Sequence, residues 1–442
     1  MKLKEPQKVS KEEILRKVEK VISSKVGIVK NVIEITRANS EPPIFSTCCR
    51  LCNTLSFMDN KCFMRHGAAG LTKEDALIAG VSEALERYCS GFYDDRDLLY
   101  SSFKDIKNQA VQPEKFALFS SKQYRDENFP FSPFTDVKKI NWVKGFSLIS
   151  EREIMIPAQM VFLPYRYRED ETIISYPTST GLSCRSSLEE AILYGLYEVI
   201  ERDGFILFWM LRPDVSKLRI DSLSRLKELF EERYNLPNWK HYICDITSDI
   251  SIPIFFTLSL GEMDFGTAVC VGASSNLSSL KAVSKSLLES AQATSFLLYK
   301  LGEEKKIYKE DFSDVGDFDD HGEFYTRMPE YQFVFDFITD SNNFIVEEDL
   351  KELSTESIIG NLKVILNILK AKEMDVIIID LTTQDVRDEG FYVVKVIVPE
   401  LIPLHGNHNF PFKGSKRLVE VPKKWGKNLR REELNPFPHP FP

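Results

Sequence analysis

Two segments of this chain carry the same pattern of acidic and basic residues, Glu-x-x-Glu-Arg, which suits the binding of metal ions. The side chains of the two copies are Glu83, Glu86 and Arg87, and then Glu198, Glu201 and Arg202. Residues three and four positions apart lie on one face of a helix. Each copy therefore places two carboxylates and a guanidinium group side by side.

Two further features extend this pattern. Glu190 lies eight residues before Glu198, a little over two helical turns, and so shares its face. A third segment contains Glu289-x-x-Gln292 at the same spacing. The helices predicted to carry these side chains span residues 72–93, 187–209 and 277–301. We therefore expect three helices that each present a stripe of carboxylate or amide groups.

The surroundings of the second copy favour a buried site over an exposed helix with surface salt bridges. Residues 192–206 are apolar on almost every side of the predicted helix, and a helix that is apolar all round is a buried one. Buried carboxylates stay ionised only with strong compensation, and Arg87 and Arg202 supply two positive charges. Mg²⁺ prefers carboxylate oxygens and usually arrives with a phosphate ligand. The pattern predicts a Mg²⁺–nucleotide site, with a structural salt-bridge network as the alternative.

A stretch of small residues precedes the first of these helices. Gly67-Ala68-Ala69-Gly70 is predicted to be a loop whose backbone N–H groups can approach an anion at the helix N-terminus. A tight turn without a ligand explains the same residues. Gly67 and Gly70 are the candidate phosphate-binding positions in this segment.

The segment 435–442 is also unusual, because four prolines alternate with other residues from Pro436 to Pro442. Proline fixes φ, so the segment is expected to be a stiff polyproline-II rod. Two interpretations stay open: a solvated tail that a proline-reading domain binds, and a docked rod that delivers the terminal carboxylate of Pro442 to a defined point. A carboxylate held near a nucleotide can act as a general base.

The rest of the chain predicts a mixed α/β (α+β) fold. A capping box, Ser10 and Glu13, starts a short amphipathic helix. Further helices are expected over residues 221–234 and 357–371, and strands near 141–149, 153–163, 241–246, 252–260, 376–380 and 393–398. Two segments lack such patterns and are expected to be loops: residues 40–63, and the acidic stretch 303–323, which we expect to be exposed.

Composition excludes several classes of protein. The chain has 442 residues, 57 Lys and Arg against 66 Asp and Glu, and a net charge of −9, which argues against a general nucleic-acid binder. No uncharged apolar run approaches the roughly 20 residues that cross a bilayer, and the first residues have no signal-like apolar region. We expect a cytoplasmic protein with neither nucleic acid nor membrane as a partner.

The cysteines favour free thiols. Eight cysteines in a long chain without a secretion signal are typical of reduced thiols. Four of them, Cys48, Cys49, Cys52 and Cys62, could hold zinc, but no second closely spaced pair supports this.

Familiar catalytic motifs do not occur in the sequence. It has no Walker A loop, G-x-G-x-x-G, H-E-x-x-H or G-x-S-x-G. The six histidines are scattered along the chain, so the sequence gives no support for a nucleophile–histidine site.

On these residues the chain resembles the YcaO family. The resemblance rests on Gly67–Tyr88, Ser179–Asp203, the segment from Gly272 to Gln292, Asp375–Leu418 and the proline tail. It spans residues 26–442 in order and leaves residues 1–25 as an N-terminal helical extension. It implies a YcaO-like fold, one large unit with β-sheets and long helices around a central nucleotide site.

The resemblance also implies roles for individual residues. The matches to the family's Mg²⁺- and nucleotide-binding carboxylates are Glu83, Glu86, Glu190, Glu198 and Glu201. Arg202 and Gln292 match its polar groups beside the phosphates and the nucleotide, and Pro442 matches the terminal residue whose carboxylate is placed for catalysis. Arg202 and Pro442 are therefore the predicted catalytic residues.

Three positions depart from what the family often has. Ala69 stands at a lysine position, Gly80 at a serine position and Thr294 at an arginine position. These departures weaken the expected phosphate contacts, while the principal acidic positions are intact.

The implied activity is ATP- and Mg²⁺-dependent activation of backbone amides. Relatives that end in alternating prolines resemble the cyclodehydratases that convert Cys, Ser and Thr of a ribosomal precursor peptide to thiazoline or oxazoline, as in the biosynthesis of thiazole/oxazole-modified peptides and bacteriocins. We expect a separate E1-like partner that binds the leader peptide, and a homodimer or heteromeric complex. Thioamide or amidine formation, a non-catalytic nucleotide-binding scaffold and a metal-dependent hydrolase stay open as alternatives.

Overall fold

The computed structural model describes residues 2–58, 61–62, 64–302, 306–424 and 429–442. Three β-sheets and eleven α-helices form the fold in these residues, which confirms the predicted mixed α/β class. The helices are α1 Lys11–Val21, α2 Lys73–Ser90, α3 Phe103–Ile106, α4 Leu188–Leu211, α5 Lys227–Arg233, α6 Ser279–Leu301, α7 Phe318–Arg327, α8 Asp336–Thr339, α9 Ile358–Ala371, α10 Gln384–Asp388 and α11 Arg417–Lys424.

The first sheet is an antiparallel meander covered by helix α2. Its order is β1-β2-β3, with β1 Val29–Ile35, β2 Phe45–Leu51 and β3 Arg65–Gly70. The hydroxyl of Thr72 accepts a hydrogen bond from the backbone N–H of Asp75 and so caps α2. Gly80 lets α2 approach the sheet, because a Cβ there would lie 2.7 Å from the hydroxyl of Thr47.

The second sheet lies beside helix α4. Its order is β4-β5-β13-β14-β7, and β6 pairs with β5. The strands are β4 Leu99–Ser102, β5 Lys139–Ser147, β6 Arg152–Pro157, β7 Leu182–Arg185, β13 Ile377–Asp380 and β14 Tyr392–Ile397. Helix α4 packs on β14 and β7. Gly195 permits this packing, because a Cβ there would lie 2.7 Å from the side chain of Val396.

The third sheet supports helix α6. Its order is β11-β10-β9-β8-β12, with β8 Ser216–Leu218, β9 Trp239–Asp245, β10 Ile254–Met263, β11 Gly266–Ser275 and β12 Asn343–Ile345. Helix α6 packs on β11 and β10. Gly272 makes this contact close, because a Cβ there would lie 2.3 Å from the backbone oxygen of Ser286.

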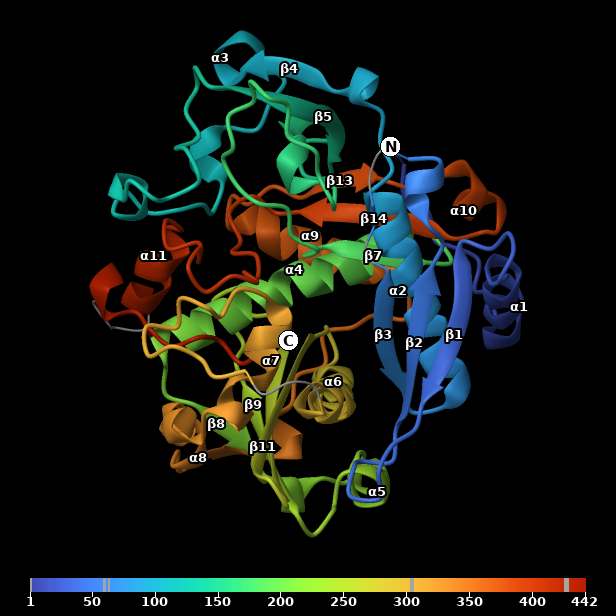
Figure 1. The fold of residues 1–442 in the computed structure, drawn as a ribbon, viewed down its shortest axis with the longest axis vertical. Coiled ribbons are helices and arrows are strands. Elements are labelled where there is room, and N and C mark those ends of the chain that lie inside the picture. The colour runs from blue at the N-terminus through green and yellow to red at the C-terminus, as the bar shows by residue number, and fades with distance from the viewer. Residues whose placement is uncertain (1, 59–60, 63, 303–305, 425–428) are drawn as a thin grey trace.

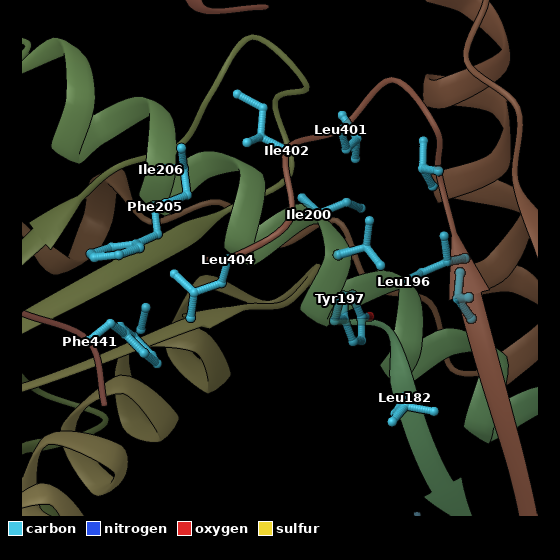
Figure 2. Close-up of a cluster of buried hydrophobic side chains, with 14 of the residues drawn as sticks. Leu182, Leu196, Tyr197, Ile200, Phe205, Ile206, Leu401, Ile402, Leu404 and Phe441 are labelled. Atoms are coloured by element: carbon cyan, nitrogen blue, oxygen red, sulfur yellow. The ribbon is translucent and has the colours of Figure 1, made fainter. Parts of the chain in front are cut away.

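Helix α4 crosses the middle of the molecule, between the second sheet and the elements around α6 (Figure 1). Its 24 residues are almost all buried, from Ala191 to Leu211. The helix is apolar all round, as the sequence predicts, because protein packs on every side of it. Figure 2 shows part of this core, where Phe205, Leu404 and Phe441 group together.

Several predictions of secondary structure hold and others are wrong. The three long helices of the sequence analysis are α2, α4 and α6. Residues 40–63 are not simply a loop, because β2 occupies the middle of that segment. The acidic stretch 303–323 is not an exposed loop: Tyr308 and Val315 are buried and α7 begins at Phe318. Residues 303–305 of that stretch lie outside the described part of the chain.

The N-terminal extension contains the predicted helix, α1. Its hydroxyl cap is Ser10, which accepts from the N–H of Glu13. Val18 and Val21 are buried in the main core. The helix is therefore confirmed, while the domain boundary at residue 26 stays a prediction.

Candidate active site

The carboxylates of α2 contact Arg87 on the same helix and strand β7. Arg87 Nη2 lies 3.4 Å from Glu83 Oε1 one helical turn away. Glu86 Oε1 accepts a hydrogen bond of 2.8 Å from the backbone N–H of Cys184 in β7. The first Glu-x-x-Glu-Arg copy is therefore held against the strand that leads into α4.

The second copy lies on α4 beside β11. Arg202 is placed between two carboxylates: its Nε is 3.8 Å from Glu198 Oε1, and its Nη1 is 3.4 Å from Glu201 Oε1. Glu201 is buried, and its Oε2 accepts from the backbone N–H of Ser275 at 3.3 Å. One guanidinium group thus serves both acids of this copy.

Helix α6 supplies the third stripe. Lys285 Nζ lies 3.3 Å from Glu289 Oε1. Gln292 Nε2 donates to the backbone oxygen of Gly67 at 3.3 Å, so two predicted nucleotide-binding residues from distant parts of the sequence meet. Helix α6 thus contacts β3, the strand that precedes α2.

Electrostatics show that the acids of the three helices act on one another. Burial, reinforced by the charges of Glu198 and Glu83 and opposed by Arg87, raises the pKa of Glu86 to about 8. Burial likewise raises the pKa of Glu83, and Glu198 and Glu289 add to the increase. The acids of α2, α4 and α6 therefore share one region in which negative charge exceeds its compensation.

Glu201 has the same property. Burial raises its pKa to about 8, Arg202 opposes this, and Glu289 and Glu198 reinforce it. A carboxyl group with such a pKa is largely protonated at neutral pH when no cation is near. Perturbed acids of this kind are typical of functional sites.

One buried guanidinium nitrogen in this region, Arg87 Nη1, has no hydrogen-bond partner among the described residues, and Arg202 Nη1 has only its 3.4 Å ion-pair contact with Glu201, which lacks hydrogen-bond geometry. Buried donors are normally satisfied. Arginine is the side chain best suited to phosphate oxygens. A phosphate group with its divalent cation fits both deficits, since the oxygens would accept from the arginines and the cation would compensate the acids.

The structure does not place Glu190 in direct contact with this group. Its Oε2 accepts from the hydroxyl groups of Ser186 at 2.9 Å and Ser187 at 3.3 Å. Ser187 in turn caps α4 by accepting from the N–H of Glu190. Glu190 therefore has a capping role, and its predicted role as a metal ligand stays a prediction that rests on its other oxygen.

The glycine-rich stretch is a strand and not the predicted loop. Residues 65–70 form β3, which pairs with β2. Strand pairing is a long-range contact that the local sequence does not reveal. Gly70 serves close packing, because a Cβ there would lie 2.4 Å from the backbone nitrogen of Ala76. The capped first turn of α2 also contains Glu74 and Asp75, which makes it a poor anion site. Gly67 and Gly70 as nucleotide-binding positions stay a prediction.

Sequence reasoning missed Lys395, a fully buried residue of β14. Its Nζ donates to the backbone oxygen of Thr178 at 2.5 Å. Burial lowers its pKa to about 7, the charge of Glu198 opposes this, and Arg87 adds to the lowering. The signal was a single lysine inside an otherwise apolar strand.

The departures from the family pattern have structural explanations. Ala69 is buried within β3. Thr294 is also buried, and its hydroxyl donates to the sulfur of Cys270 at 3.5 Å. Gly80 is needed for the close contact of α2 with β2 described above. Thr294 and Gly80 therefore serve the packing of α6 and α2 on their sheets.

The cysteines behave as thiols. All eight are free, and within the described residues no group of three or more His, Cys, Asp or Glu side chains has the geometry of a ready-made metal site. This applies to Cys48, Cys49, Cys52 and Cys62 as well as to the acids of the three helices, which lie near one another without converging on a single point.

The acids of α2, α4 and α6 form what we call the carboxylate region. Two cavities lie outside it. A cavity of about 660 Å³ between β8, β9 and α5 is lined by Lys217, Phe230 and Tyr242, among others. A small apolar cavity of about 60 Å³ is lined by Val199 and Lys395 among others. None of the predicted site residues lines either cavity.

The proline segment is docked and not solvated. Residues 438–441 are buried, and Pro442 is exposed at the end. The guanidinium carbon of Arg202 lies 4.2 Å from the centre of the Phe441 ring, a cation–π contact. The end of the tail is thus in direct contact with a residue of the carboxylate region.

The sequence of this chain matches a known protein family. Residues 67–402 match the model of the YcaO cyclodehydratase family, which is described as ATP- and Mg²⁺-binding. The match covers far more than half of the chain, and the protein belongs to the YcaO family.

Two relatives illustrate the sequence similarity. An uncharacterized protein of Methanothermobacter thermautotrophicus is 26% identical over 342 residues, which are 76% of this chain and 81% of that protein. An uncharacterized protein from the tfuA 3′ region of Rhizobium leguminosarum bv. trifolii is 26% identical over 166 residues, 35% of this chain and 39% of that protein.

Solved structures share the fold. A heterocyclase in complex with substrate and cofactor has a TM-score of 0.80 at 21% identity, and it is covered over 59% of its length by the whole of this chain. The heterocyclase TruD gives 0.69 at 20%, with 55% of its length covered by the whole of this chain. The YcaO protein of Methanopyrus kandleri bound with AMPPCP and Mg²⁺ gives 0.62 at 19%, over 89% of this chain and 92% of that one. The chain therefore spans little more than half the length of the two heterocyclases.

Helices long and apolar enough to cross a bilayer are not found in the part of the chain that the structure describes. The cytoplasmic location stays a prediction.

Proposed function

We propose that this protein uses ATP and Mg²⁺ to phosphorylate a backbone amide oxygen of a ribosomal precursor peptide and thereby forms thiazoline or oxazoline rings. The observation that supports this most is the meeting of under-compensated acids from α2, α4 and α6 next to Arg202 and to Arg87, whose Nη1 lacks a partner. Membership of the YcaO family supports the same activity.

In this proposal the acids hold the cation. The proposed ligands are Glu83, Glu86, Glu190, Glu198 and Glu201. Bound Mg²⁺ neutralises charge on the phosphate oxygens. The guanidinium groups of Arg87 and Arg202 donate to those oxygens, and Gln292, Glu289 and the strand around Gly67 form the nucleotide side. Binding requires that the acids with raised pKa values lose their protons.

The chemistry needs positioning more than a protein nucleophile. The side-chain sulfur or oxygen of a Cys, Ser or Thr of the peptide attacks the preceding carbonyl carbon and loses its proton. The carbonyl oxygen takes the γ-phosphoryl group of ATP. Phosphate then leaves with that oxygen and the amide nitrogen loses its proton, which leaves a ring with a C=N bond, ADP and phosphate.

The carboxylate of Pro442 is the proposed base for one of these protons. Two observations support it: the tail is docked, and its penultimate residue Phe441 contacts Arg202. A carboxylate at the end of a buried rod is fixed in position while remaining open to a substrate, since Pro442 itself is exposed.

The leader peptide of the substrate requires its own binding site. We propose a separate E1-like protein that supplies it, and a homodimer or heteromeric complex as the active assembly.

Mass spectrometry of a candidate precursor peptide tests the proposal. The peptide is incubated with the full chain, the E1-like protein, ATP and Mg²⁺. We expect loss of one water per modified residue and one ADP per ring. Exchange of oxygen for sulfur would instead indicate thioamide formation. Nucleotide binding without any change in peptide mass would favour the scaffold alternative.

Two variants serve as controls. Glu201→Gln is expected to weaken nucleotide binding about 100-fold and to form little or no product. A chain that lacks Pro442 is expected to bind the nucleotide and to form little or no ring, and full activity of that chain would contradict the role of the carboxylate.

A further inference from the structure

The docked tail is held through its backbone carbonyl oxygens. Trp209 Nε1 donates to the oxygen of Phe437 at 3.0 Å, Tyr325 Oη to that of Pro438 at 2.6 Å, and His321 Nδ1 lies 2.6 Å from that of His439. Proline lacks an N–H group, so a proline-rich rod offers mainly acceptors. Three consecutive carbonyls thus meet three aromatic donors from α4 and α7.

Contacts fix the ring orientation of both histidines. A carbonyl oxygen only accepts, so His321 carries its proton on Nδ1. His439 Nδ1 accepts from the N–H of Phe441 at 3.3 Å, and its Nε2 donates to the oxygen of His405 at 2.6 Å. The His321 and His439 rings are stacked, with centres 3.8 Å apart and planes 9° apart. His321 of α7 therefore fixes the position of the tail at His439.

The next residue of α7 touches the end of the tail. A Cβ at Gly322 would lie 3.0 Å from Pro442 Cβ and 3.2 Å from the ring of Phe296. A side chain at this position would require Pro442 or Phe296 to move by a few tenths of an ångström, so glycine leaves Pro442 in its observed place. His321 and Gly322 are adjacent in sequence and contact the tail three residues apart.

Phe441 connects this arrangement to the carboxylates. Its ring lies 5.1 Å from that of Phe205 and under the guanidinium group of Arg202. Between the His439 anchor and Pro442 the tail therefore has no freedom to shift along α4 without losing the contact with Arg202.

We propose that His321 and Gly322 of α7 are positioning residues that set the place of Pro442 relative to Arg202. The proposal rests on the proposed function for the role of the Pro442 carboxylate. The contacts named here lie outside the helices that carry the acids, so the two can be tested separately.

Replacement of His321 separates its hydrogen bond from its bulk. Asn places an amide N–H where His321 Nδ1 is, and so keeps the donor, whereas Leu removes it. His241 is the matched control: it is buried, lies 2.7 Å from the Ser259 hydroxyl and 2.9 Å from the Tyr234 oxygen, and lies on β9.

The first measurement follows the tail directly and needs no substrate. The full chain is made with 4-fluorophenylalanine at position 441, and its ¹⁹F resonance is recorded. We expect one resonance away from the denatured position in the parent chain, in His321→Asn and in His241→Leu. In His321→Leu we expect it to broaden or move toward the denatured position, and in Gly322→Ala to shift to a new position. An unchanged resonance in both α7 variants would overturn the proposal.

The second measurement is the turnover of the precursor peptide. A displacement of 1 Å at a reacting group can cost about 100-fold in rate, so we expect a loss of about tenfold or more in kcat for His321→Leu and a smaller loss for Gly322→Ala. His321→Asn is expected to restore most of the rate. In a chain that lacks Pro442, His321→Leu is expected to cause no further loss.

These outcomes separate the two proposals. An equal loss of kcat with and without Pro442 would show that His321 acts only on stability and would overturn the positioning role. If no variant and no parent chain forms product while the ¹⁹F resonance responds as expected, the proposed function fails and the placement of the tail by α7 stands.

Discussion

The carboxylate region (the acids of α2, α4 and α6) and the tail-docking region (residues 437–442 and their contacts on α4 and α7) lie along the same helix, α4, and differ in charge. In the tail-docking region the backbone oxygens of residues 437–439 each have a donor at 3.0 Å or less, although His321 Nε2 and His405 Nδ1 lack partners among the described residues. In the carboxylate region the acids raise one another's pKa values, and Arg87 Nη1 lacks a partner.

This difference indicates which region is completed by a ligand. A tail carbonyl oxygen that has its donor needs no ligand, whereas neighbouring buried acids cost free energy until a cation compensates them. Glu171 shows that this chain can bury an acid at low cost. Its two oxygens accept from the side chains of Gln159 and Tyr165 and from the N–H of Asn141, among other donors.

Glu201→Gln is the variant that best tests whether the carboxylate region binds a ligand. We expect nucleotide affinity to fall about 100-fold, or about 2.7 kcal/mol. Stability without ligand should change less than in Glu171→Gln, because burial raises the pKa of Glu201 and already disfavours its charged form. Calorimetric titration with AMPPCP and Mg²⁺, together with urea unfolding, measures both quantities.

Glu171→Gln is the matched control. An amide turns one acceptor into a donor that faces other donors, so we expect a loss of stability of about 2 kcal/mol and unchanged nucleotide affinity. Similar behaviour of the two variants would show that the contrast between satisfied and unsatisfied acids has no functional meaning.

The tail-docking region should respond in stability. Phe441→Ala removes the ring that packs on Phe205 and under Arg202, and we expect a loss of about 2 kcal/mol in unfolding free energy. Phe57, whose side chain is 54% exposed, provides a control substitution with little expected effect. Urea unfolding of both variants checks this, and equal losses would contradict a docked tail.

Removal of Mg²⁺ should affect the carboxylate region most. We expect EDTA to weaken AMPPCP binding by at least about tenfold, or about 1.4 kcal/mol, because no cation then joins the acids to the phosphates. Proteolysis of the tail should respond far less, since only the contact of Arg202 with Phe441 links the two regions. Binding that is indifferent to EDTA would contradict the proposed role of the acids.

Lowering the pH should reduce the stability of the tail-docking region. Burial lowers the pKa of His321 to about 3 and that of His408 to about 4. These histidines stay neutral in the fold and take up protons near pH 6.5 in the unfolded chain. Stability is therefore complete above about pH 6.5 and falls toward pH 4, by about 1.4 kcal/mol per pH unit for each histidine.

Unfolding titrations at several pH values between 7 and 4 measure this slope. Carboxylates contribute to it as well, so the informative quantity is the difference between the parent chain and His321→Asn. We expect the variant to be less sensitive by about one proton. Identical slopes would show that His321 is already protonated in the fold.

The sequence reveals what depends on local spacing. The helices α2, α4 and α6 and the acids on them follow from a period of three to four residues, and the buried nature of α4 follows from its composition. The glycine stretch before α2 was misjudged because β3 forms only by pairing with β2. The choice between strand and loop there depends on residues about 20 positions away in the chain.

The tail-docking region shows the same limit more strongly. His321, His405 and His439 look scattered in the sequence, and their rings meet only through the folding of α7 and the tail against α4. The sequence left the tail open between solvated and docked. Lys395 could have been found, because a charged residue in a buried strand violates the local pattern.

Arg202 belongs to both regions at once. Its guanidinium group lies beside Glu198 and Glu201 and also above the ring of Phe441. A ligand that draws this group toward itself must change the free energy of that second contact, and the change is reciprocal by thermodynamic linkage. One side chain thus gives the molecule a coupling between occupancy of the acidic cluster and retention of its last residues, with no moving domain required.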